Sequence, residues 1–293
     1  MTTRKEKTEK LLKYKPTGKA EYINRFTPYA KEIANDVSKI RIRGRRPNTL
    51  FIGEAGSGKS VLTHALYVMS RESGDMPCSG FYRVNLHQAS DISSLIGERY
   101  PSITNGQVDL PFRKGQGYIA IEKGGLWAIE EANRGGDLTR VFNLMDYSEF
   151  FEVPEESATP LKVHSNLWIV GTMNPTGSDY TTKMMDKALD QRFSVKVKIT
   201  DSNPLVDEES MIHDILKDKT YTERMLAFAT TCREDGNGTK LSVREISNIC
   251  SHISNGIDLL RSIEFVTTNA YSIEQVEQIK STATIKFRVV EEK

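Results

Sequence analysis

A short glycine-rich segment at residues 53–60 constrains the fold of this chain more than any other feature of its sequence. Its residues, Gly53-Glu54-Ala55-Gly56-Ser57-Gly58-Lys59-Ser60, fit the pattern G-x-x-x-x-G-K-[ST] of a phosphate-binding loop. The apolar residues 49–52 before it predict a short buried strand, and residues 61–69 after it predict a helix. The order strand, loop and helix predicts an α/β fold built around a P-loop.

Each part of this loop has a physical role in holding a polyphosphate. Glycine lacks a Cβ, so the backbone can turn tightly and approach the phosphates closely. The N–H groups of the loop and the positive end of the next helix dipole form an anion site. Lys59 supplies a cation for the β and γ phosphates, and the hydroxyl of Ser60 supplies a ligand for Mg²⁺. The predicted nucleotide-binding residues are Gly53, Glu54, Ala55, Gly56, Ser57, Gly58, Lys59, Ser60 and Val61.

Hydrophobic patterning divides the chain into three parts. We expect a basic N-terminal segment with an amphipathic helix at 1–44, an α/β core with a parallel sheet at 45–200, and a helical lid with a tail at 201–293. Strands are predicted at 49–52, 81–85, 118–121, 126–131, 167–175 and 195–199, a hairpin at 150–153 and 161–164, and a surface excursion at 100–117. Lid helices are predicted at 211–216, 221–232, 242–253 and 273–279, and residues 284–290 predict a closing strand or a tail.

Two acids at the end of a buried strand supply the chemistry that a P-loop lacks. Glu130 and Glu131 directly follow four apolar residues. Glu130 would hold Mg²⁺ through its waters, and Glu131 would orient and polarise an attacking water. Asn174, at the tip of the 167–174 strand, would bond the same water or the γ-phosphate. The alternatives are an exposed acidic strand end and a turn-forming asparagine before Pro175.

Two arginines are candidates for stabilising charge on a phosphoryl group. Arg192 lies just before the predicted strand at 195–199, and would serve the γ-phosphate of a neighbouring subunit. Arg244 begins a predicted lid helix and would reach back to the phosphates. Taken alone, either residue fits an ordinary surface arginine better than a catalytic one, because surface arginines are common.

Composition excludes several classes of protein. The formal net charge is +1, and Cys78, Cys232 and Cys250 lack metal-ligand spacing, so we expect neither a disulfide framework nor a zinc site. No apolar run is long enough to span a bilayer, and no signal-peptide pattern is present, so a cytoplasmic location is expected. Basic clusters at 4–19 and 41–46 are either solvated segments or contacts for a phosphate backbone.

The order of these segments resembles that of the AAA+ ATPases. Residues 53–60 look like Walker A, 126–131 like Walker B, Asn174 like sensor 1, Arg192 like the arginine finger and Arg244 like sensor 2. The chain is most similar to the MoxR group, including CbbQ/NorQ-type chaperones, and to its dynein-related relatives. The segments that carry this likeness are Glu130-Glu131-Ala132-Asn133-Arg134, the hairpin at 150–161, and residues 90–97, 171–175 and 188–193. It covers about residues 45–255.

The resemblance implies a three-layer αβα core followed by a small helical lid, and an ATPase that uses ATP and Mg²⁺. It also implies a homo-oligomeric ring, usually a hexamer, in which Arg192 completes the site of the next subunit and Arg134 also acts across the boundary. The work of such a ring would be to remodel a client protein, either directly or through a von Willebrand A-type adaptor.

Two other functions stay open from the sequence. The basic clusters suggest a nucleic-acid-associated motor or NTPase. Residues 175–177, however, do not match the restriction-type relatives. The family usually has aspartate where this chain has Glu130. This difference suggests a nucleotide-gated ring subunit that does not hydrolyse ATP.

Overall fold

The structure is a computed structural model that describes residues 26–72, 74, 77–87, 90, 92–104, 107–134, 139–175, 184–234, 236 and 239–287. The described residues form two compact units. One contains Ala30–Glu54 and Lys59–Asp201, and the other contains the residues up to Tyr29, Ala55–Gly58 and the chain from Ser202 onward. The predicted basic stretch at 4–19, and the end of the predicted segment 284–290, lie outside the described residues.

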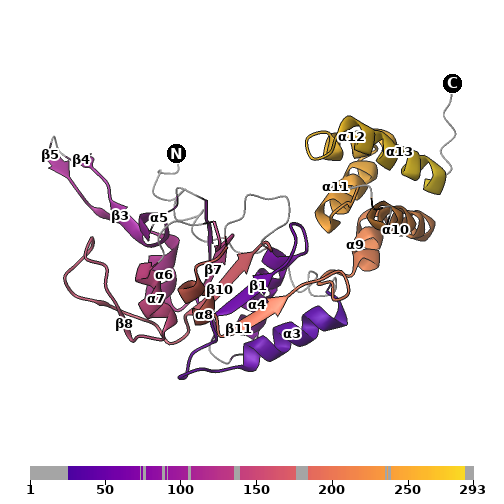
Figure 1. Ribbon diagram of the computed structural model, residues 1–293. Helices are drawn as coiled ribbons and strands as arrows, with labels where there is room; N and C mark the ends of the chain where they lie inside the picture. The colour runs from indigo at the N-terminus through magenta and orange to yellow at the C-terminus, as the bar shows by residue number, and fades with distance from the viewer. Residues whose placement is uncertain are drawn as a thin grey trace. The chain divides into compact units, whose positions relative to one another are not determined.

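A parallel five-stranded sheet forms the centre of the first unit (Figure 1). Its strands lie in the order β11-β1-β10-β7-β2. Their bounds are Thr49–Ile52 for β1, Phe81–Asn85 for β2, Leu126–Glu130 for β7, Trp168–Met173 for β10 and Val195–Lys198 for β11. The apolar runs of β7 and β10 are buried along their whole length, as expected for central strands of a parallel sheet. The predicted α/β class with a parallel sheet is confirmed.

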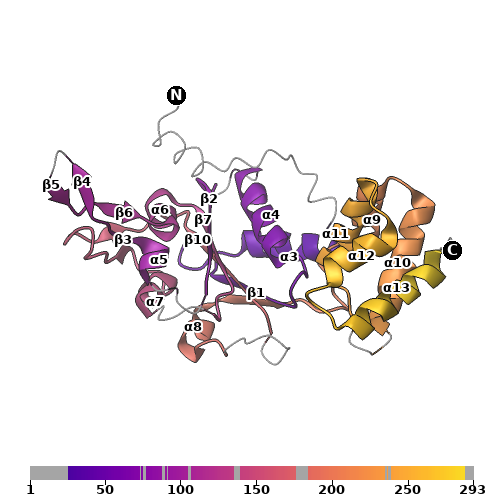
Figure 2. The same cartoon turned by 90° about the horizontal axis from the view of Figure 1, so that it is seen from above.

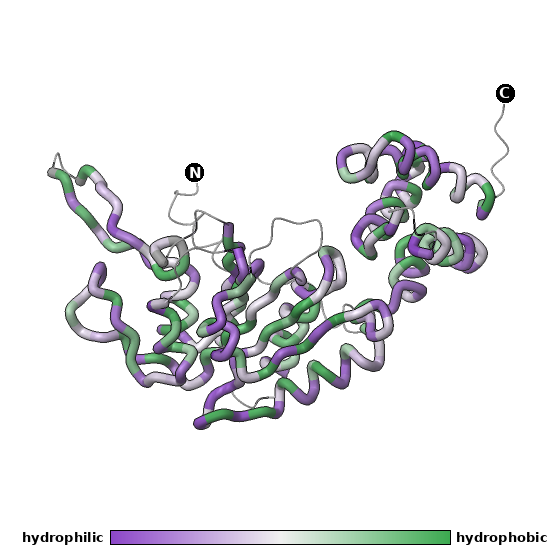
Figure 3. Tube along the Cα trace, in the orientation of Figure 1, coloured by the Kyte–Doolittle hydropathy of each residue, from purple (hydrophilic) through white to green (hydrophobic). Residues whose placement is uncertain are grey.

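Helices lie on both faces of this sheet and complete the three layers. The helix α4 (Lys59–Glu72) follows β1 and lies on one face, whereas α7 (Thr139–Met145) and α8 (Lys187–Arg192) lie on the opposite face (Figure 2). Right-handed crossovers explain this division, because the chain moves in one direction along the sheet after β1 and in the other direction after β2. The N-terminal helix α3 (Pro28–Lys39) is amphipathic, with alternating hydrophilic and hydrophobic residues along its length (Figure 3).

The predicted strand at 118–121 is wrong, because these residues belong to the helix α6 (Gln116–Lys123). Tyr118 and Ile121 are buried three residues apart on one face, and Gly124 ends the helix in the left-handed conformation with φ 76°. The short apolar run fits both a strand and a helix by its composition. Its packing against the sheet decides for a helix.

The predicted surface excursion at 100–117 is a β-ribbon that follows the short helix α5 (Ile92–Ile96). Its antiparallel pairs are β3 (Gly97–Arg99) with β6 (Phe112–Lys114) and β4 (Ser102–Thr104) with β5 (Gln107–Asp109). Ile103 and Val108 face each other across the outer pair and are 78% and 72% exposed. The predicted hairpin is also present, as β8 (Phe150–Phe151) and β9 (Leu161–Lys162).

The second unit has a helical core of its own. Its helices are α9 (Glu208–Leu216), α10 (Lys219–Glu234), α11 (Val243–Ser254), α12 (Leu259–Thr267) and α13 (Ile273–Phe287). The helix α12 was not predicted. The expectation of a strand or tail at 284–290 is wrong up to Phe287, because α13 continues to that residue. Phe287 is buried against the rings of Tyr221 and Phe228, and this contact holds the last turn as helix.

The three cysteines are buried, free thiols. Burial raises the pKa of Cys78 and raises the pKa of Cys250 to about 12, so both remain protonated near neutral pH. Within the described residues, no group of histidine, cysteine and acidic side chains has the arrangement of a metal site. In the same part of the chain, no helix combines the length and apolar character that a bilayer crossing requires.

We expect the substitution Gly171→Ala in β10 to lower the free energy of unfolding by about 1–3 kcal/mol. A Cβ at this position would lie 2.7 Å from Cζ of Phe193 and 3.1 Å from Cδ1 of Leu50. Urea unfolding of the variant measures the loss. The loss should be smaller when Gly171→Ala is introduced together with Phe193→Leu, which makes room. Equal losses in both backgrounds would contradict this packing.

Candidate functional site

The P-loop begins where the central strands of the sheet end. The strand β10 lies between β1 and β7, so the carboxyl ends of all three meet at one edge. The backbone N–H of Gly53 donates to the carbonyl oxygen of Met173 at 3.2 Å, and that of Ala132 donates to Thr172 at 2.9 Å. The start of the loop and the turn after the two acids therefore flank the tip of β10. Crevices at such strand ends are where open parallel sheets bind ligands.

Lys59 is the buried cation of this edge, with 8% of the residue exposed. Its Nζ donates to the carbonyl oxygens of Gly53 and Glu54, each at 2.7 Å, and to Oδ1 of Asn174 at 3.1 Å. An ammonium group has three protons to donate, and these three oxygens hold it inside the loop. The predicted partners Lys59 and Asn174 are thus in direct contact, although 115 residues separate them in the sequence.

Asn174 also lies next to the acidic turn. The Nδ2 of Asn133 donates to its carbonyl oxygen at 3.4 Å, and both asparagines are buried. Asn133 is part of the segment Glu130-Glu131-Ala132-Asn133-Arg134 but was not itself predicted as a site residue. The hydrogen bond from Asn133 links the turn after β7 to the tip of β10. The sequence pattern alone does not show that these two segments are neighbours.

The two acids have different environments. Glu130 is the last residue of β7, is 5% exposed, and its carboxylate forms an ion pair with Arg83 of β2 at 2.5 Å. Glu131 is partly exposed, has φ 55°, and forms an ion pair with Arg134 at 2.8 Å. A non-glycine residue in the left-handed region costs of order 1–3 kcal/mol and is typical of functional turns. The backbone thus turns at Glu131, directly after the strand.

The residues predicted to bind Mg²⁺ fit that ion chemically. Ser60 provides a hydroxyl at the start of α4, and Glu130 provides a buried carboxylate at a strand end. Oxygen ligands, with waters completing the shell, are what Mg²⁺ prefers in nucleotide sites. Arg83, which was not predicted, already neutralises Glu130 and would share this carboxylate with the ion.

The tip of the P-loop, Ala55–Gly58, is packed within the helical unit. Gly56 has φ 81°, and a Cβ there would lie 3.1 Å from Cβ of Ser242 and 3.4 Å from Cβ of Arg244. Gly58 has φ 90°, and a Cβ there would lie 2.8 Å from Cγ2 of Val206. The loop therefore needs glycine for its backbone angles and for these close approaches. The predicted residue Arg244 is exposed, and its Cβ lies beside Gly56.

Arg192 is held by its own unit. Its Nε and Nη2 contact Oδ2 of Asp146 at 3.1 and 3.0 Å, and its Nη1 donates to the carbonyl oxygen of Ala188 at 2.9 Å. Its guanidinium also lies 4.4 Å from the centre of the Phe142 ring. The structure does not bring Arg192 to the residues around Lys59. Asp146 was not found from the sequence, because nothing in the linear pattern relates α7 to the end of α8.

The arginines of the basic cluster at 41–46 have structural roles. Arg46 is 1% exposed, lies 4.5 Å from the centre of the Trp168 ring, and donates to the carbonyl oxygen of Ser38 at 3.0 Å. Arg45 donates to the carbonyl oxygen of Ser148 at 2.9 Å, and burial lowers its pKa. Arg46 is therefore removed from the surface that a phosphate backbone would contact, and Arg45 is partly buried and bonded to the fold.

Comparison with protein families identifies one domain. The sequence pattern described as AAA domain (dynein-related subfamily) matches residues 48–193, which contain the P-loop, both acids, Asn174 and Arg192. No curated protein matches the chain.

Solved structures with a similar fold include NtrX from Brucella abortus. One structure of it has a TM-score of 0.52 and 15% identity, and the match covers 92% of this chain and 59% of NtrX. NtrX in complex with ADP has a TM-score of 0.52 and 14% identity, covering 96% and 66%. This chain thus spans about three fifths of the length of NtrX, and at these identities the likeness concerns the fold.

We expect Gly58→Ala to destabilise the protein more than Gly44→Ala. Both glycines have positive φ, 90° and 77°, so both alanines carry the cost of about 1–2 kcal/mol for a left-handed residue. Only the alanine at 58 would also meet Val206, because a Cβ at 44 has no atom within 4 Å among the described residues. Urea unfolding of the two variants gives the difference. Equal destabilisation would show that Val206 does not pack against the loop.

Proposed function

Residues 48–193 match the pattern of an AAA domain of the dynein-related subfamily, and from this premise we propose that the chain is an ATP-binding and ATP-hydrolysing ring motor of the MoxR type. The observation that carries the proposal is the contact of Lys59 with Asn174 and with the loop carbonyls, beside the turn that bears Glu131. A mobile cation, a polar strand tip and a carboxylate at one edge are the groups that phosphoryl transfer requires.

Binding would begin with an exchange of partners at Lys59. The ammonium leaves the carbonyl oxygens of Gly53 and Glu54 and contacts the β and γ phosphates, which are stronger acceptors. The N–H groups of the loop and of the first turn of α4 hold the phosphate oxygens. Mg²⁺, held by Ser60 and through water by Glu130, would neutralise charge on those oxygens. Asn174 stays at the strand tip and holds the γ-phosphate or the attacking water.

Hydrolysis would then use Glu131. Its carboxylate accepts a hydrogen bond from the attacking water and orients it in line with the bond that breaks. The ion pair with Arg134 holds the same carboxylate, at 2.8 Å in a partly exposed position. Arg134 therefore limits the rotation of the Glu131 side chain, and its release frees the carboxylate for the water.

Arg192 would act in the neighbouring subunit of a homo-oligomeric ring. It cannot reach a second nucleotide while both Nε and Nη2 contact Asp146. Ring assembly would exchange Asp146 for the γ-phosphate, and a finger arginine is worth about 10³–10⁵ in kcat in well-studied systems. The client would be another protein, reached directly or through a von Willebrand A-type adaptor. The exposed pair Ile103 and Val108 on the ribbon is consistent with such a contact.

A nucleotide-gated subunit without hydrolysis is a second candidate, and one observation favours it. Arg83 already pairs with Glu130, the residue that stands where the family usually has aspartate. A carboxylate retained by an arginine would bind Mg²⁺ more weakly and slow turnover. The structural roles of Arg45 and Arg46 argue against the alternative of a nucleic-acid motor.

The hydrolytic proposal predicts a steady-state ATPase rate that Lys59→Ala and Glu131→Gln each reduce by at least tenfold. Lys59→Ala removes the cation that binds the phosphates, and Glu131→Gln keeps the shape but removes the charge that polarises water. ADP binding by calorimetry separates the two, because only Lys59→Ala should weaken it. A wild-type protein that binds ADP but has no ATPase rate would favour the non-hydrolysing subunit.

The shared-site proposal predicts that Arg192→Ala loses ATPase activity while the rings still form. Lys196→Ala is the matched control, because it removes a neighbouring surface cation that pairs with Asp190. Asp146→Asn removes the ion pair that holds Arg192, so it should raise the ATPase rate at low protein concentration. The increase should be at most several-fold, because a partly exposed ion pair contributes about 0–1 kcal/mol. Negative-stain images and ATPase assays check both. Intact activity of Arg192→Ala in formed rings would exclude the shared site.

A further inference from the structure

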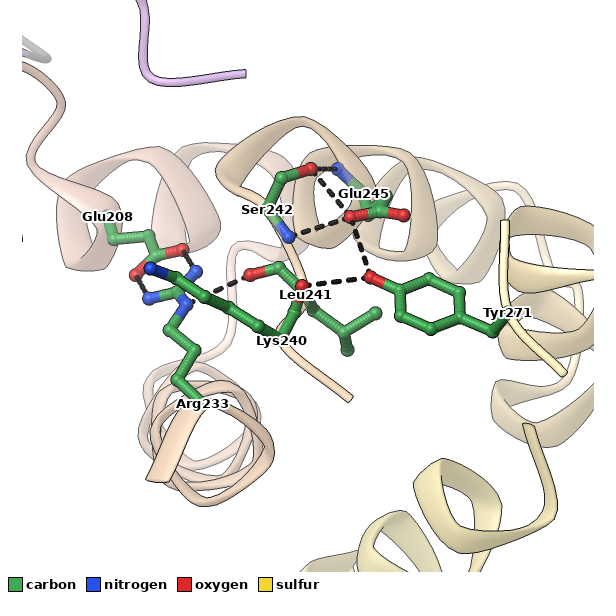
Figure 4. A network of polar contacts seen from close by, with 7 residues as sticks. All are labelled: Glu208, Arg233, Lys240, Leu241, Ser242, Glu245 and Tyr271. Atoms are coloured by element: carbon green, nitrogen blue, oxygen red, sulfur yellow. Dashed lines mark hydrogen bonds and ion pairs between the residues drawn. The ribbon is translucent and has the colours of Figure 1, made fainter. Parts of the chain in front are cut away.

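Arg233 of α10 joins two separate segments of the helical unit (Figure 4). Its Nη1 and Nη2 donate to the two carboxylate oxygens of Glu208 at 2.7 and 2.6 Å, and its Nε donates to the carbonyl oxygen of Leu241 at 2.9 Å. Glu208 is the first residue of α9, and Leu241 lies just before α11. One partly buried guanidinium therefore fixes the start of α9 relative to the start of α11 through charge-assisted bonds.

Tyr271 holds the second of these segments from another side (Figure 4). Its hydroxyl donates to the carbonyl oxygen of Lys240 at 2.8 Å and lies 3.3 Å from Oε2 of Glu245. The same carboxylate oxygen accepts the backbone N–H of Ser242 at 2.7 Å, and Ser242 Oγ accepts from the N–H of Glu245, which makes a capping box. Residues 240–242 are thus tied to two other parts of the unit, the helix α10 through Arg233 and the turn before α13 through Tyr271.

The two segments joined by Arg233 are the same two that contact the tip of the P-loop. Val206, two residues before Glu208, lies against Gly58, and Ser242, the residue after Leu241, lies against Gly56. The Cβ of Arg244, the second residue of α11, also lies beside Gly56. A small shift of either segment would remove the contacts that support the P-loop tip. Gly56 and Gly58 have no side chains that could replace these contacts.

We propose that Arg233, with Glu208 and Tyr271, is a positioning device for nucleotide binding. It sets the conformation of the P-loop tip and the position of Arg244 beside Gly56. Lysine at 233 would keep the charge but could not bridge both carboxylate oxygens and the Leu241 carbonyl at once. This inference rests on the proposed function, since it assumes that the loop binds a nucleotide.

The test compares Arg233→Lys with the wild-type chain. We expect the Kd for ADP by calorimetry, and the KM for ATP, to rise about tenfold, the equivalent of about one charge-assisted hydrogen bond. The kcat should change less than twofold, because Arg233 touches neither the water nor Glu131. Lys280→Gln is the matched control. It removes another cation of the same unit, which pairs with Glu264 and Glu277, and it should leave the Kd for ADP unchanged.

A double-mutant cycle distinguishes positioning from general stabilisation. When Arg244→Ala is already present, adding Arg233→Lys should weaken ADP binding by clearly less than tenfold, because part of its effect passes through Arg244. Full additivity would overturn the link to Arg244. If Arg233→Lys does not fold, Tyr271→Phe replaces it, since it removes one hydroxyl and keeps the ring, and it should raise the Kd about threefold, a fraction of one hydrogen bond.

The outcomes separate the two proposals. A wild-type chain that binds no ADP would overturn the nucleotide site itself. A wild-type chain that binds ADP, together with unchanged Kd values for Arg233→Lys and Tyr271→Phe, would overturn the positioning device and leave the nucleotide site intact.

Discussion

The contact between Lys59 and Asn174 depends on a single topological constraint, the insertion of β10 between β1 and β7. Parallel strands end on the same side, so this order places the P-loop and the acidic turn on either side of one strand tip. An order with more strands between β1 and β7 would move Lys59 away from the turn that carries Glu131. The burial of β7 and β10 along their whole length stabilises this arrangement, because a shift in register would expose their apolar residues.

A second property of the candidate site residues is that their charged groups already have partners within the chain. Lys59, Glu130, Glu131 and Arg192 are each engaged by another residue of the chain, and three of the four partnerships are ion pairs. Buried or half-buried charges require such partners, since an unpaired charge out of water is costly. Under the proposed function, phosphate oxygens would replace the carbonyl oxygens that hold Lys59, and a metal ion would share Glu130 with Arg83, so neither charge would be left uncompensated. The positive φ of Glu131 indicates that the turn is already strained toward one conformation.

Much of the first unit was predictable from sequence, for reasons that differ between residues. The pattern of the P-loop is local, and the strands at 49–52, 81–85 and 195–199 agree with β1, β2 and β11 because their apolar patterns are unambiguous. Residues 118–121 fit two structures equally well, and only packing of Tyr118 and Ile121 against the sheet decides between them. The ion pairs of Arg83 with Glu130 and of Arg192 with Asp146 depend on which elements become neighbours. No pattern along the chain contains that information.

The P-loop itself shows why contiguity in sequence is an incomplete guide. Its first residue bonds to the end of β10, whereas its tip packs against Val206 and Ser242 of the helical unit. The backbone angles of Gly56 and Gly58 are therefore determined by residues about 150 to 190 positions later in the chain. Those residues are in turn held by hydrogen bonds from the guanidinium of Arg233 and the hydroxyl of Tyr271. A phosphate-binding motif of eight residues thus depends for its shape on side chains that no local pattern includes, and under our proposal changes in those side chains would alter nucleotide binding without touching a nucleotide.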